Sequence, residues 1–362
     1  MKKILLLVRS LGLGGAERQL VLLAKGLRCK GWNVKIVTFY NECSYSLEGC
    51  EHIVLDKKSR YDFLGFFKNL YSLLKQEKPD VVYSFMTVGN LANLVTRLAC
   101  PKALSVWGVR ASIMDLFAYD FFARLTSFFE KALMRFSQGV IANSTEALET
   151  VCHPNKVVVY NGIDTKTFCF NLSKRQGFRE KLGLNETHKV IAIVGRFDPM
   201  KDHETFFKMA KLLYEKNKNI RFVIMGNGPK DYEAFFLKLS KKLKLNEVLQ
   251  IIPAQTPPPY EAFDVVVSSS AFGEGFSNVL SEALSTGIPC VGTKVGQTPF
   301  LLGEEWCGPV KDYKALALKV LDCLELYPSV PVKSLRHRIE KDFSLETMVE
   351  NTIKAFEAFK KQ

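Results

Sequence analysis

The chain has 362 residues, of which 47% are hydrophobic and 24% charged, and its mean hydropathy is close to zero. This length and composition predict a globular protein of two domains and exclude a disordered or fibrous chain. No apolar run approaches the roughly 20 residues of a membrane-spanning helix, and the apolar run after Met1 is too short for a secretory signal, so a buried first strand is expected there.

The net charge of +13 is unevenly distributed, since residues 1–168 carry 22 Lys/Arg against 14 Asp/Glu. The basic residues are dispersed and no nucleic-acid-binding motif is present, so an anionic membrane surface is the preferred partner and no nucleic acid is expected. Nine cysteines without paired spacing indicate a reducing, cytoplasmic location. Five histidines without metal-ligand spacing predict no metal site.

The distribution of apolar residues predicts strands alternating with helices along the whole chain. Strands are expected at 3–9, 34–39, 80–84, 103–107, 139–142, 157–160, 189–194, 220–225, 248–252, 263–268 and 289–291, and helices at 15–30, 62–77, 89–99, 120–136, 203–216, 230–243, 277–286, 312–325 and 345–359. This alternation predicts an α/β fold with two Rossmann-like domains facing each other across a cleft. A turn-rich segment from Asn161 to Phe168 separates them, so the domains are expected at 1–165 and 166–344.

The segment from Phe272 to Pro289 is the most informative part of the sequence. It follows a Val-rich run that is typical of a buried strand, and it then changes to helical spacing. Ser277 and Asn278 are good N-cap residues, Gly287 suits the position after the helix, and a proline cannot continue it. The segment therefore predicts a strand, a polar loop and a helix in succession.

Two carboxylates and the start of this helix suit a phosphorylated ligand. Glu274 lies in the loop and Glu282 two turns into the helix, a separation of at most about 12 Å along a helix, so they can address opposite ends of an extended ligand. Backbone N–H groups and the positive end of the helix dipole favour an anion between them. The residues expected to surround that anion are Gly275, Phe276, Ser277, Asn278 and Val279.

Arg196 and Lys201 follow the strand expected at 189–194, at the end where α/β sheets bind ligands. A diphosphate leaving group needs its developing charge neutralised by a metal or by fixed cations. The chain has no Asp-x-Asp metal motif, so this pair is the expected solution; the alternative is a solvated basic loop.

Two glycine-containing turns are further candidates. Gly14 and Gly15 do not fit a dinucleotide-binding fingerprint, because Glu17 stands where a glycine or alanine is required. They are expected to allow a close approach to a phosphate and an acceptor. Gly226 and Gly228, followed by Pro229, fit an ordinary turn by their residue types, and only the family resemblance described below makes them candidate donor-binding residues.

Taken together, these motifs resemble those of glycosyltransferase family 4, whose members are retaining enzymes of the GT-B fold. The two glutamates resemble the family's E-x7-E signature and the Arg–Lys pair its G-R-x4-K clamp. The turn at 225–229 resembles its G-x-G-P loop, 161–168 its interdomain N-G-(I/V)-D-x3-F segment, and 13–19 its N-terminal glycine loop. The resemblance runs from end to end of the chain.

The resemblance implies a role for each motif. Glu282 would bind the ribose of a nucleotide, Glu274 would lie near the anomeric centre of the donor sugar, and Arg196 and Lys201 would hold the diphosphate. It also implies that the C-terminal helix, about 345–362, crosses back to the N-terminal domain.

The sequence departs from the family pattern in two places. Many relatives carry a histidine after the strand near 103–107, whereas none lies here between His52 and His153, so Trp107 or Arg110 is expected to line the site in its place. A run of three prolines at 257–259 replaces a longer segment near the nucleobase.

The motifs and the family that they resemble together imply a metal-independent, retaining glycosyltransferase that moves a sugar from a nucleoside diphosphate, with UDP favoured, to a lipid-linked or glycan acceptor. The alternatives are a nucleotide-sugar epimerase, for which histidines near the motifs are missing, and a non-catalytic partner subunit. The segment 114–136 combines seven aromatics with basic residues. It predicts either a buried crossover helix or a helix at the inner face of the cytoplasmic membrane, where the protein would be peripheral. The sequence does not indicate an oligomeric state.

Overall fold

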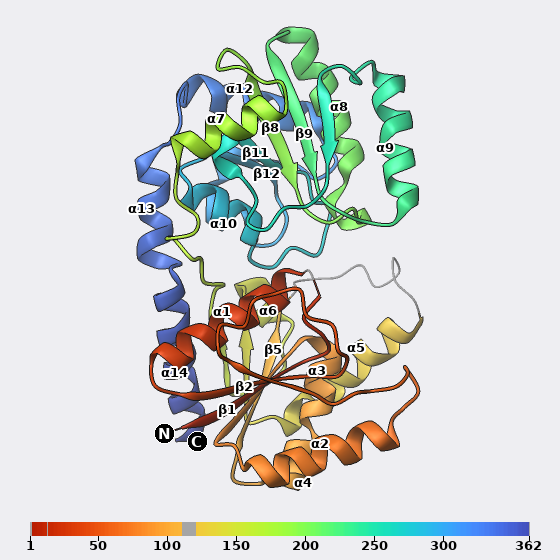
Figure 1. The fold of residues 1–362 in the computed structure, drawn as a ribbon, viewed down its shortest axis with the longest axis vertical. Coiled ribbons are helices and arrows are strands. Elements are labelled where there is room, and N and C mark those ends of the chain that lie inside the picture. Colours follow the sequence, from red (N-terminus) through yellow and green to blue (C-terminus); the bar gives the residue numbers. More distant parts are fainter. Residues whose placement is uncertain (1, 13, 111–120, 362) are drawn as a thin grey trace. The chain divides into compact units, whose positions relative to one another are not determined.

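The computed structural model describes residues 2–12, 14–110 and 121–361. Its internal contacts divide the chain into two units: unit 1 comprises 1–162 and 345–362, and unit 2 comprises 163–344 (Figure 1). Each unit is a parallel sheet with helices packed against it, so the predicted α/β fold with two Rossmann-like domains is confirmed. Within the described ranges, no helix has both the length and the apolar character needed to cross a membrane.

Unit 1 contains a seven-stranded sheet in the order β3-β2-β1-β4-β5-β6-β7, in which all neighbouring strands are parallel. Its strands are β1 (Lys3–Val8), β2 (Asn33–Thr38), β3 (Glu51–Val54), β4 (Val81–Phe85), β5 (Leu104–Val109), β6 (Gly139–Ala142) and β7 (Lys156–Val158). Its helices are α1 (Gly15–Cys29), α2 (Leu64–Glu77), α3 (Met86–Asn93), α4 (Val95–Ala99), α5 (Phe121–Leu133), α6 (Thr145–Glu149) and α14 (Leu345–Lys360). The sequence missed β3 and α6, which are short, and residues 114–120 of the expected aromatic helix lie outside the described residues.

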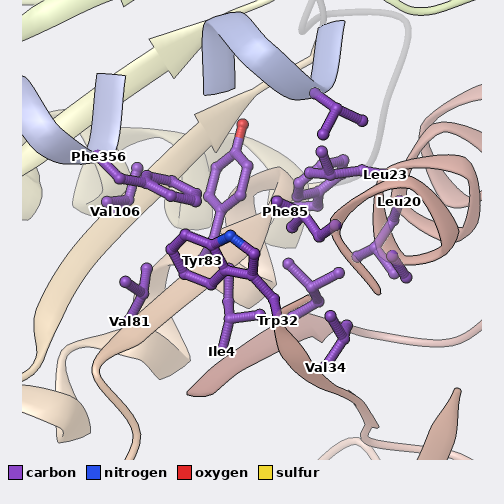
Figure 2. Close-up of a cluster of buried hydrophobic side chains, with 14 of the residues drawn as sticks. Ile4, Leu20, Leu23, Trp32, Val34, Val81, Tyr83, Phe85, Val106 and Phe356 are labelled. Atoms are coloured by element: carbon purple, nitrogen blue, oxygen red, sulfur yellow. The ribbon is translucent and has the colours of Figure 1, made fainter. Parts of the chain in front are cut away.

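The C-terminal helix α14 belongs to the core of unit 1, as Figure 2 shows. The ring of Phe356 lies 6.0 Å from that of Trp32 and 5.6 Å from that of Tyr83. A Cβ at Gly139, the first residue of β6, would lie 2.2 Å from the ring of Phe359, so the helix packs directly on the strand backbone. The predicted return of the C-terminal helix to the first domain is therefore confirmed.

Unit 2 contains a six-stranded parallel sheet in the order β10-β9-β8-β11-β12-β13. Its strands are β8 (Lys189–Val194), β9 (Ile220–Met225), β10 (Leu249–Ile252), β11 (Val265–Ser268), β12 (Cys290–Thr293) and β13 (Cys307–Gly308). Its helices are α7 (Leu172–Lys181), α8 (His203–Lys216), α9 (Lys230–Leu243), α10 (Asn278–Ser285), α11 (Thr298–Leu302), α12 (Tyr313–Leu326) and α13 (Lys333–Asp342). The sequence missed α7, α11, α13 and the two-residue strand β13.

Helix α7 is fixed by buried arginines instead of an apolar face. Arg175 and Arg179 donate to the two carboxylate oxygens of Asp264 at 3.0 and 3.2 Å, and all three side chains are buried. Arg179 also donates to the carbonyl oxygen of Ala262. These bonds tie α7 to the segment that leads into β11, which includes the short 3-10 turn η4 (Tyr260–Ala262).

Helix α10 ends as its sequence predicts. Gly287 has φ of +78° and donates to the carbonyl of Leu284, while Ile288 donates to the carbonyl of Ala283. This pair of bonds closes the helix with a left-handed glycine, and Pro289 follows. The predicted glycine stop is confirmed.

Candidate functional site

The loops after β8 and β11 form the centre of the candidate site in unit 2. The two strands are neighbours in the sheet, so their carboxyl ends meet at one edge. Ser269 Oγ donates to the carbonyl oxygens of Lys201 and Asp202 at 2.9 and 3.0 Å, and the amide of Ala271 donates to the carbonyl of Met200 at 2.8 Å. The turn that carries Lys201 is therefore fixed against the loop that carries Glu274.

Glu274 is buried and in contact with a cation and a hydroxyl. Its Oε1 atom accepts from Lys201 Nζ, and Ser270 Oγ donates to the same oxygen at 2.7 Å. Burial alone would raise the pKa of Glu274, but the charge of Lys201 and the bonds from Lys201 and Ser270 outweigh it and hold the pKa below its ordinary value. Glu274 is therefore ionised at neutral pH, and the structure brings two predicted site residues, 73 positions apart in sequence, into direct contact.

Arg196 occupies a different environment from Lys201. Its side chain is 62% exposed, and Nη2 donates to Asp198 Oδ2 at 2.9 Å. Asp198 also caps the short turn before α8 by accepting from the amide of Met200. An exposed pair of this kind holds the guanidinium only weakly, so Arg196 is able to reorient towards a ligand. No sequence motif marks Asp198.

Gly226 and Gly228 allow two loops to approach each other closely. A Cβ at Gly226 would lie 1.9 Å from the carbonyl oxygen of Gly195, and one at Gly228 would lie 2.4 Å from Cβ of Phe197. The amide of Phe197 donates to the carbonyl of Asn227 at 2.9 Å, which completes the contact. Both glycines thus have a structural role beside the loop of Arg196, and Pro229 follows at the N-cap of α9.

The N-terminal end of α10 is supported by the turn after β12. A Cβ at Gly296, where φ is +56°, would lie 1.8 Å from the carbonyl oxygen of Glu274, and the amide of Gln297 donates to the carbonyl of Gly275 at 3.1 Å. Phe276 packs on Phe343 with ring centroids 4.9 Å apart. The helix begins at Asn278 after Ser277, so the amides of its first turn, Val279 among them, have no partners within the helix itself.

Glu282 is more deeply enclosed than the sequence suggests. Its side chain is 1% exposed, and its Oε2 atom accepts from the hydroxyl of Tyr260 at 2.9 Å. Tyr260 is itself fully buried and belongs to η4, the turn that α7 anchors. A ribose can reach Glu282 only if the surroundings of this carboxylate rearrange. The sequence contains no pattern that links Tyr260 to Glu282, so this partner could not be predicted.

In unit 1, Tyr45 holds the N-terminal glycine loop in place. The amide of Gly14 donates to Tyr45 Oη at 3.0 Å, and this hydroxyl donates to the carbonyl of Gly14 at 2.9 Å. Gly15 then begins α1. Tyr45 is 31 residues away and belongs to no motif, so its contact with the glycine loop could not be predicted from the sequence.

The two residues expected to replace the histidine behave differently. Trp107 is fully buried in a cluster with Met134 and Val140, where no ligand reaches it, so the expectation for Trp107 is corrected. Trp107 and Val109 are two positions apart on β5 and belong to the same cluster, so Trp107 lies on the face of the sheet that packs against Met134. Arg110 is half-buried, donates to the hydroxyl of Tyr83 and lies 3.9 Å from the ring centroid of Phe85. Arg110 remains the candidate on this strand.

A buried polar network follows β4 and β5 in the same unit. Glu130 of α5 accepts from Thr87 and from Asn90, each at 2.6 Å. Burial raises the pKa of Glu130, and these two bonds partly oppose the rise. Asn90 also donates to the carbonyl of Gly108 at 3.1 Å, so α5 is joined to the carboxyl end of β5. No sequence motif marks this network.

His203 contradicts the expectation that no histidine lies near the motifs, since it is two residues from Lys201. It packs between Phe197 and Phe236, with centroid distances of 5.5 and 4.8 Å, and neither ring nitrogen has a hydrogen-bond partner in the described part of the chain. Burial lowers its pKa to about 4, and the charge of Lys201 adds to the effect, whereas Asp198 opposes it. His203 is thus a neutral core residue at pH 7 and is unsuited to proton transfer with a substrate.

Two family models match nearly the whole chain. The model described as Glycosyltransferase Family 4 matches residues 13–167, and the model described as Glycosyl transferases group 1 matches residues 174–342. The chain is therefore a member of the glycosyltransferases that these two models describe. Lys201, Glu274 and Glu282 all lie within the second match, and Gly14, Gly15 and Arg110 within the first.

Individual relatives agree with this assignment. The glycosyltransferase is 27% identical to an N-acetylgalactosamine-N,N'-diacetylbacillosaminyl-diphospho-undecaprenol 4-alpha-N-acetylgalactosaminyltransferase of Campylobacter jejuni, over 84% of this chain and 85% of that protein. It is 26% identical to a D-inositol 3-phosphate glycosyltransferase of Corynebacterium glutamicum, over 51% of this chain and only 47% of the relative's length. The fold matches that of Anabaena HepE in complex with UDP-glucose, with a TM-score of 0.84, 18% identity, and coverage of 99% and 100% of the two chains.

Proposed function

We propose that this glycosyltransferase is a retaining enzyme that transfers a sugar from a UDP-sugar to a lipid-linked glycan precursor. The single observation that carries the proposal is the Lys201–Glu274–Ser270 contact at the carboxyl ends of β8 and β11. It combines a fixed cation with an ionised carboxylate beside the start of α10, which is the chemistry that a nucleoside diphosphate-sugar requires.

In the proposed reaction, the bond between the anomeric carbon and the diphosphate oxygen breaks, and its electron pair leaves with the diphosphate. The acceptor hydroxyl oxygen bonds to the anomeric carbon, and its proton passes to the departing diphosphate oxygen. Lys201, Arg196 and the first amides of α10 stabilise the charge that develops on the diphosphate. Glu274 would face the sugar, and Glu282 would bind the ribose once Tyr260 releases it. No metal ion is invoked for this charge stabilisation.

The proposed acceptor class is supported by relatives whose names specify an undecaprenol carrier. A lipid-bound acceptor implies that the enzyme works at a membrane surface, which we propose is the inner face of the cytoplasmic membrane. Two features of unit 1 support this. Phe128 and Phe129 of α5 are 66% and 44% exposed next to the basic Lys131, and Leu64 at the start of α2 is 90% exposed. These aromatics are exposed, which favours an interfacial helix over a buried one.

The test is an assay of the whole protein with a panel of UDP- and GDP-sugars, with and without an undecaprenyl-diphosphate-linked sugar and with and without EDTA. We expect UDP release that depends on the acceptor, a product with the donor's anomeric configuration by NMR, and activity that survives EDTA. Turnover without acceptor would establish the epimerase alternative, and UDP binding without turnover the non-catalytic subunit. A product with inverted configuration would refute the retaining mechanism.

A further inference from the structure

A pocket of about 330 Å³ opens in unit 2 between α7, the proline run 257–259 and the C-terminal end of α10. This volume lies at the lower end of the roughly 300–1,000 Å³ range of small-molecule sites, so it suits a compact ligand. None of the residues assigned to the diphosphate, ribose or sugar of the donor lines it, whereas the proline run, which stands where relatives carry a segment near the nucleobase, does. The residues that do line it include Lys174, Gly177, Phe178, Lys181, Glu261 and Thr286.

One face of α7 forms the wall of this pocket. Lys174, Gly177, Phe178 and Lys181 are spaced by three, four and seven positions, which places them on the same side of the helix. Arg175 and Arg179, on another face, are buried and bound to Asp264 as described above. The wall of the pocket is therefore rigidly attached to the core of unit 2.

Gly177 keeps this wall hollow. It lies inside α7, its φ is not positive, and a Cβ built on it would have no atom within 4 Å. Neither backbone conformation nor close packing therefore requires a glycine, although glycine destabilises a helix relative to alanine. Because Gly177 lines the pocket, a larger side chain there would fill the space that is now open.

The charges at the rim favour an anion. Lys174 and Lys181 are both exposed, and neither forms an ion pair with a carboxylate of the described ranges. Their positions on α7 are about 10 Å apart along the helix axis. Glu261, in contrast, is a buried carboxylate; burial raises its pKa, which its own backbone amide and Lys174 partly oppose. A ligand would thus meet cations at the rim and a hydrogen-bonding carboxyl group deeper in the pocket.

The remaining walls are flat and apolar. Phe178 faces the pocket from α7, and Pro257, Pro258 and Pro259 line it from the loop before η4. Rigid aromatic and proline surfaces suit the apolar face of a ring, and a few polar groups beside them fix its orientation.

We propose that this pocket is a second binding site, for a sugar that carries a phosphate or carboxylate group. The anionic group would lie between Lys174 and Lys181, the ring would pack on Phe178, and a hydroxyl would bind Glu261. The choice of a sugar rests on the proposed function, since saccharides are the substrates and products of this enzyme class.

The test is calorimetric titration of the whole protein, saturated with UDP to occupy the donor site. The probes are glucose 6-phosphate as a free sugar phosphate, a glucuronate-terminated trisaccharide as a glycan end, and glucose and inorganic phosphate as partial ligands. At least one acidic sugar should bind tenfold more tightly than either partial ligand. Gly177→Leu and the Lys174→Gln/Lys181→Gln double variant should each weaken it at least tenfold, whereas Lys238→Gln/Lys241→Gln on α9 removes the same charge and should have no effect.

Three outcomes would overturn the site. The first is that neither acidic sugar binds, and the second is that phosphate alone binds as tightly as they do. The third is that binding survives the Gly177→Leu substitution in a variant whose Tm shows that it is folded. UDP is titrated first in the same experiment. Absence of UDP binding would count against the proposed function, and this result is distinct from the result for the pocket.

Discussion

Glu274 is a buried carboxylate that remains ionised because Lys201 and Ser270 contact it. Its pKa in the folded protein lies below the unfolded value of about 4.3. The contact therefore stabilises the fold above that pH, and this stabilisation is lost as the pH falls through the lowered pKa. The contact with Glu274 also fixes Lys201, the cation that the proposed reaction needs. A substitution of either residue should therefore change both the stability of the fold and the rate of the reaction.

Lys201→Met should lower kcat by about 10²–10³-fold, because the fixed positive charge near the leaving group is lost. Steady-state kinetics with the donor identified by the assay above measures this, and the Tm reports folding. Lys208→Met is the matched control, since Lys208 is an exposed lysine of α8 paired only with Glu204 at 2.7 Å in the described structure. Wild-type kcat in Lys201→Met would refute the proposed role.

The same variant should also change the pH profile. Without Lys201, burial is no longer opposed by a cation, so the pKa of Glu274 should rise. The acidic limb of the profile of kcat/KM against pH should then move to higher pH. An acidic limb that stays in place would show that Glu274 does not control it.

Substitutions of Glu274 and Glu282 should have different effects on nucleotide binding. Glu282→Gln should weaken binding of free UDP, because the proposed ribose contact exists without the sugar, whereas Glu274→Gln should leave UDP affinity nearly unchanged and depress turnover. Calorimetry with UDP measures both variants. The reverse order would exchange the proposed roles.

At the scale of elements, α7 and η4 form a support for α10. Two arginines of α7 hold Asp264 and the backbone around η4, and Tyr260 of η4 holds Glu282 of α10. Glu282, the residue proposed to bind the ribose, is therefore positioned through helix α7, which is far from it in sequence.

Arg179→Met should lower the free energy of unfolding by about 3–5 kcal/mol, because it leaves the buried Asp264 without one of its cations. Urea denaturation measures the change. Arg196→Met is the control, since it removes an exposed pair with Asp198 and should cost at most about 1 kcal/mol. Equal losses in the two variants would contradict the supporting role of α7.

The sequence predicted those elements whose apolar pattern is regular, including the central strands, α10 with its glycine stop, and the returning helix α14. It missed α7 because the buried face of that helix consists of arginines, which no hydrophobic period reveals. At the site, the motif spacing predicted the loops of Lys201 and Glu274. Their contact, and the partners Tyr260, Tyr45 and Asp198, depend on tertiary packing and could not be read from spacing. Trp107 was wrongly expected to line the site. The face of the sheet on which a strand residue lies depends on strand alternation, and the sequence did not show which face of β5 is buried.

At the scale of the whole molecule, the excess of positive charge in the first half coincides with exposed aromatics in unit 1. Exposed cations near anionic lipid contribute about 1 kcal/mol each and are screened within a Debye length. We therefore expect binding to anionic vesicles that weakens as salt is added.

Replacing Phe128 and Phe129 with Ser, and Lys131 and Arg135 with Gln, should abolish vesicle binding while UDP binding persists. Sedimentation with phosphatidylglycerol-containing vesicles at low and high salt measures this, with phosphatidylcholine vesicles as the control. Unfolding of the variant would show that these side chains belong to the core, and indifference of the wild type to anionic vesicles would remove the membrane proposal.

The position of α14 has a consequence for biosynthesis. The core of unit 1 needs Phe356 and Phe359, but residues 163–344 are synthesised before them. At about 5–20 residues per second, the ribosome adds that stretch in roughly 10–40 s. During this time the nascent first unit lacks part of its core, whereas unit 2 has all of its own residues once Ser344 is added, before Phe356 and Phe359. The second unit can thus fold to completion before the first, which reverses the usual N-terminal-first order and leaves the aromatic surface around Tyr83 and Trp32 open to chaperones until the last helix emerges.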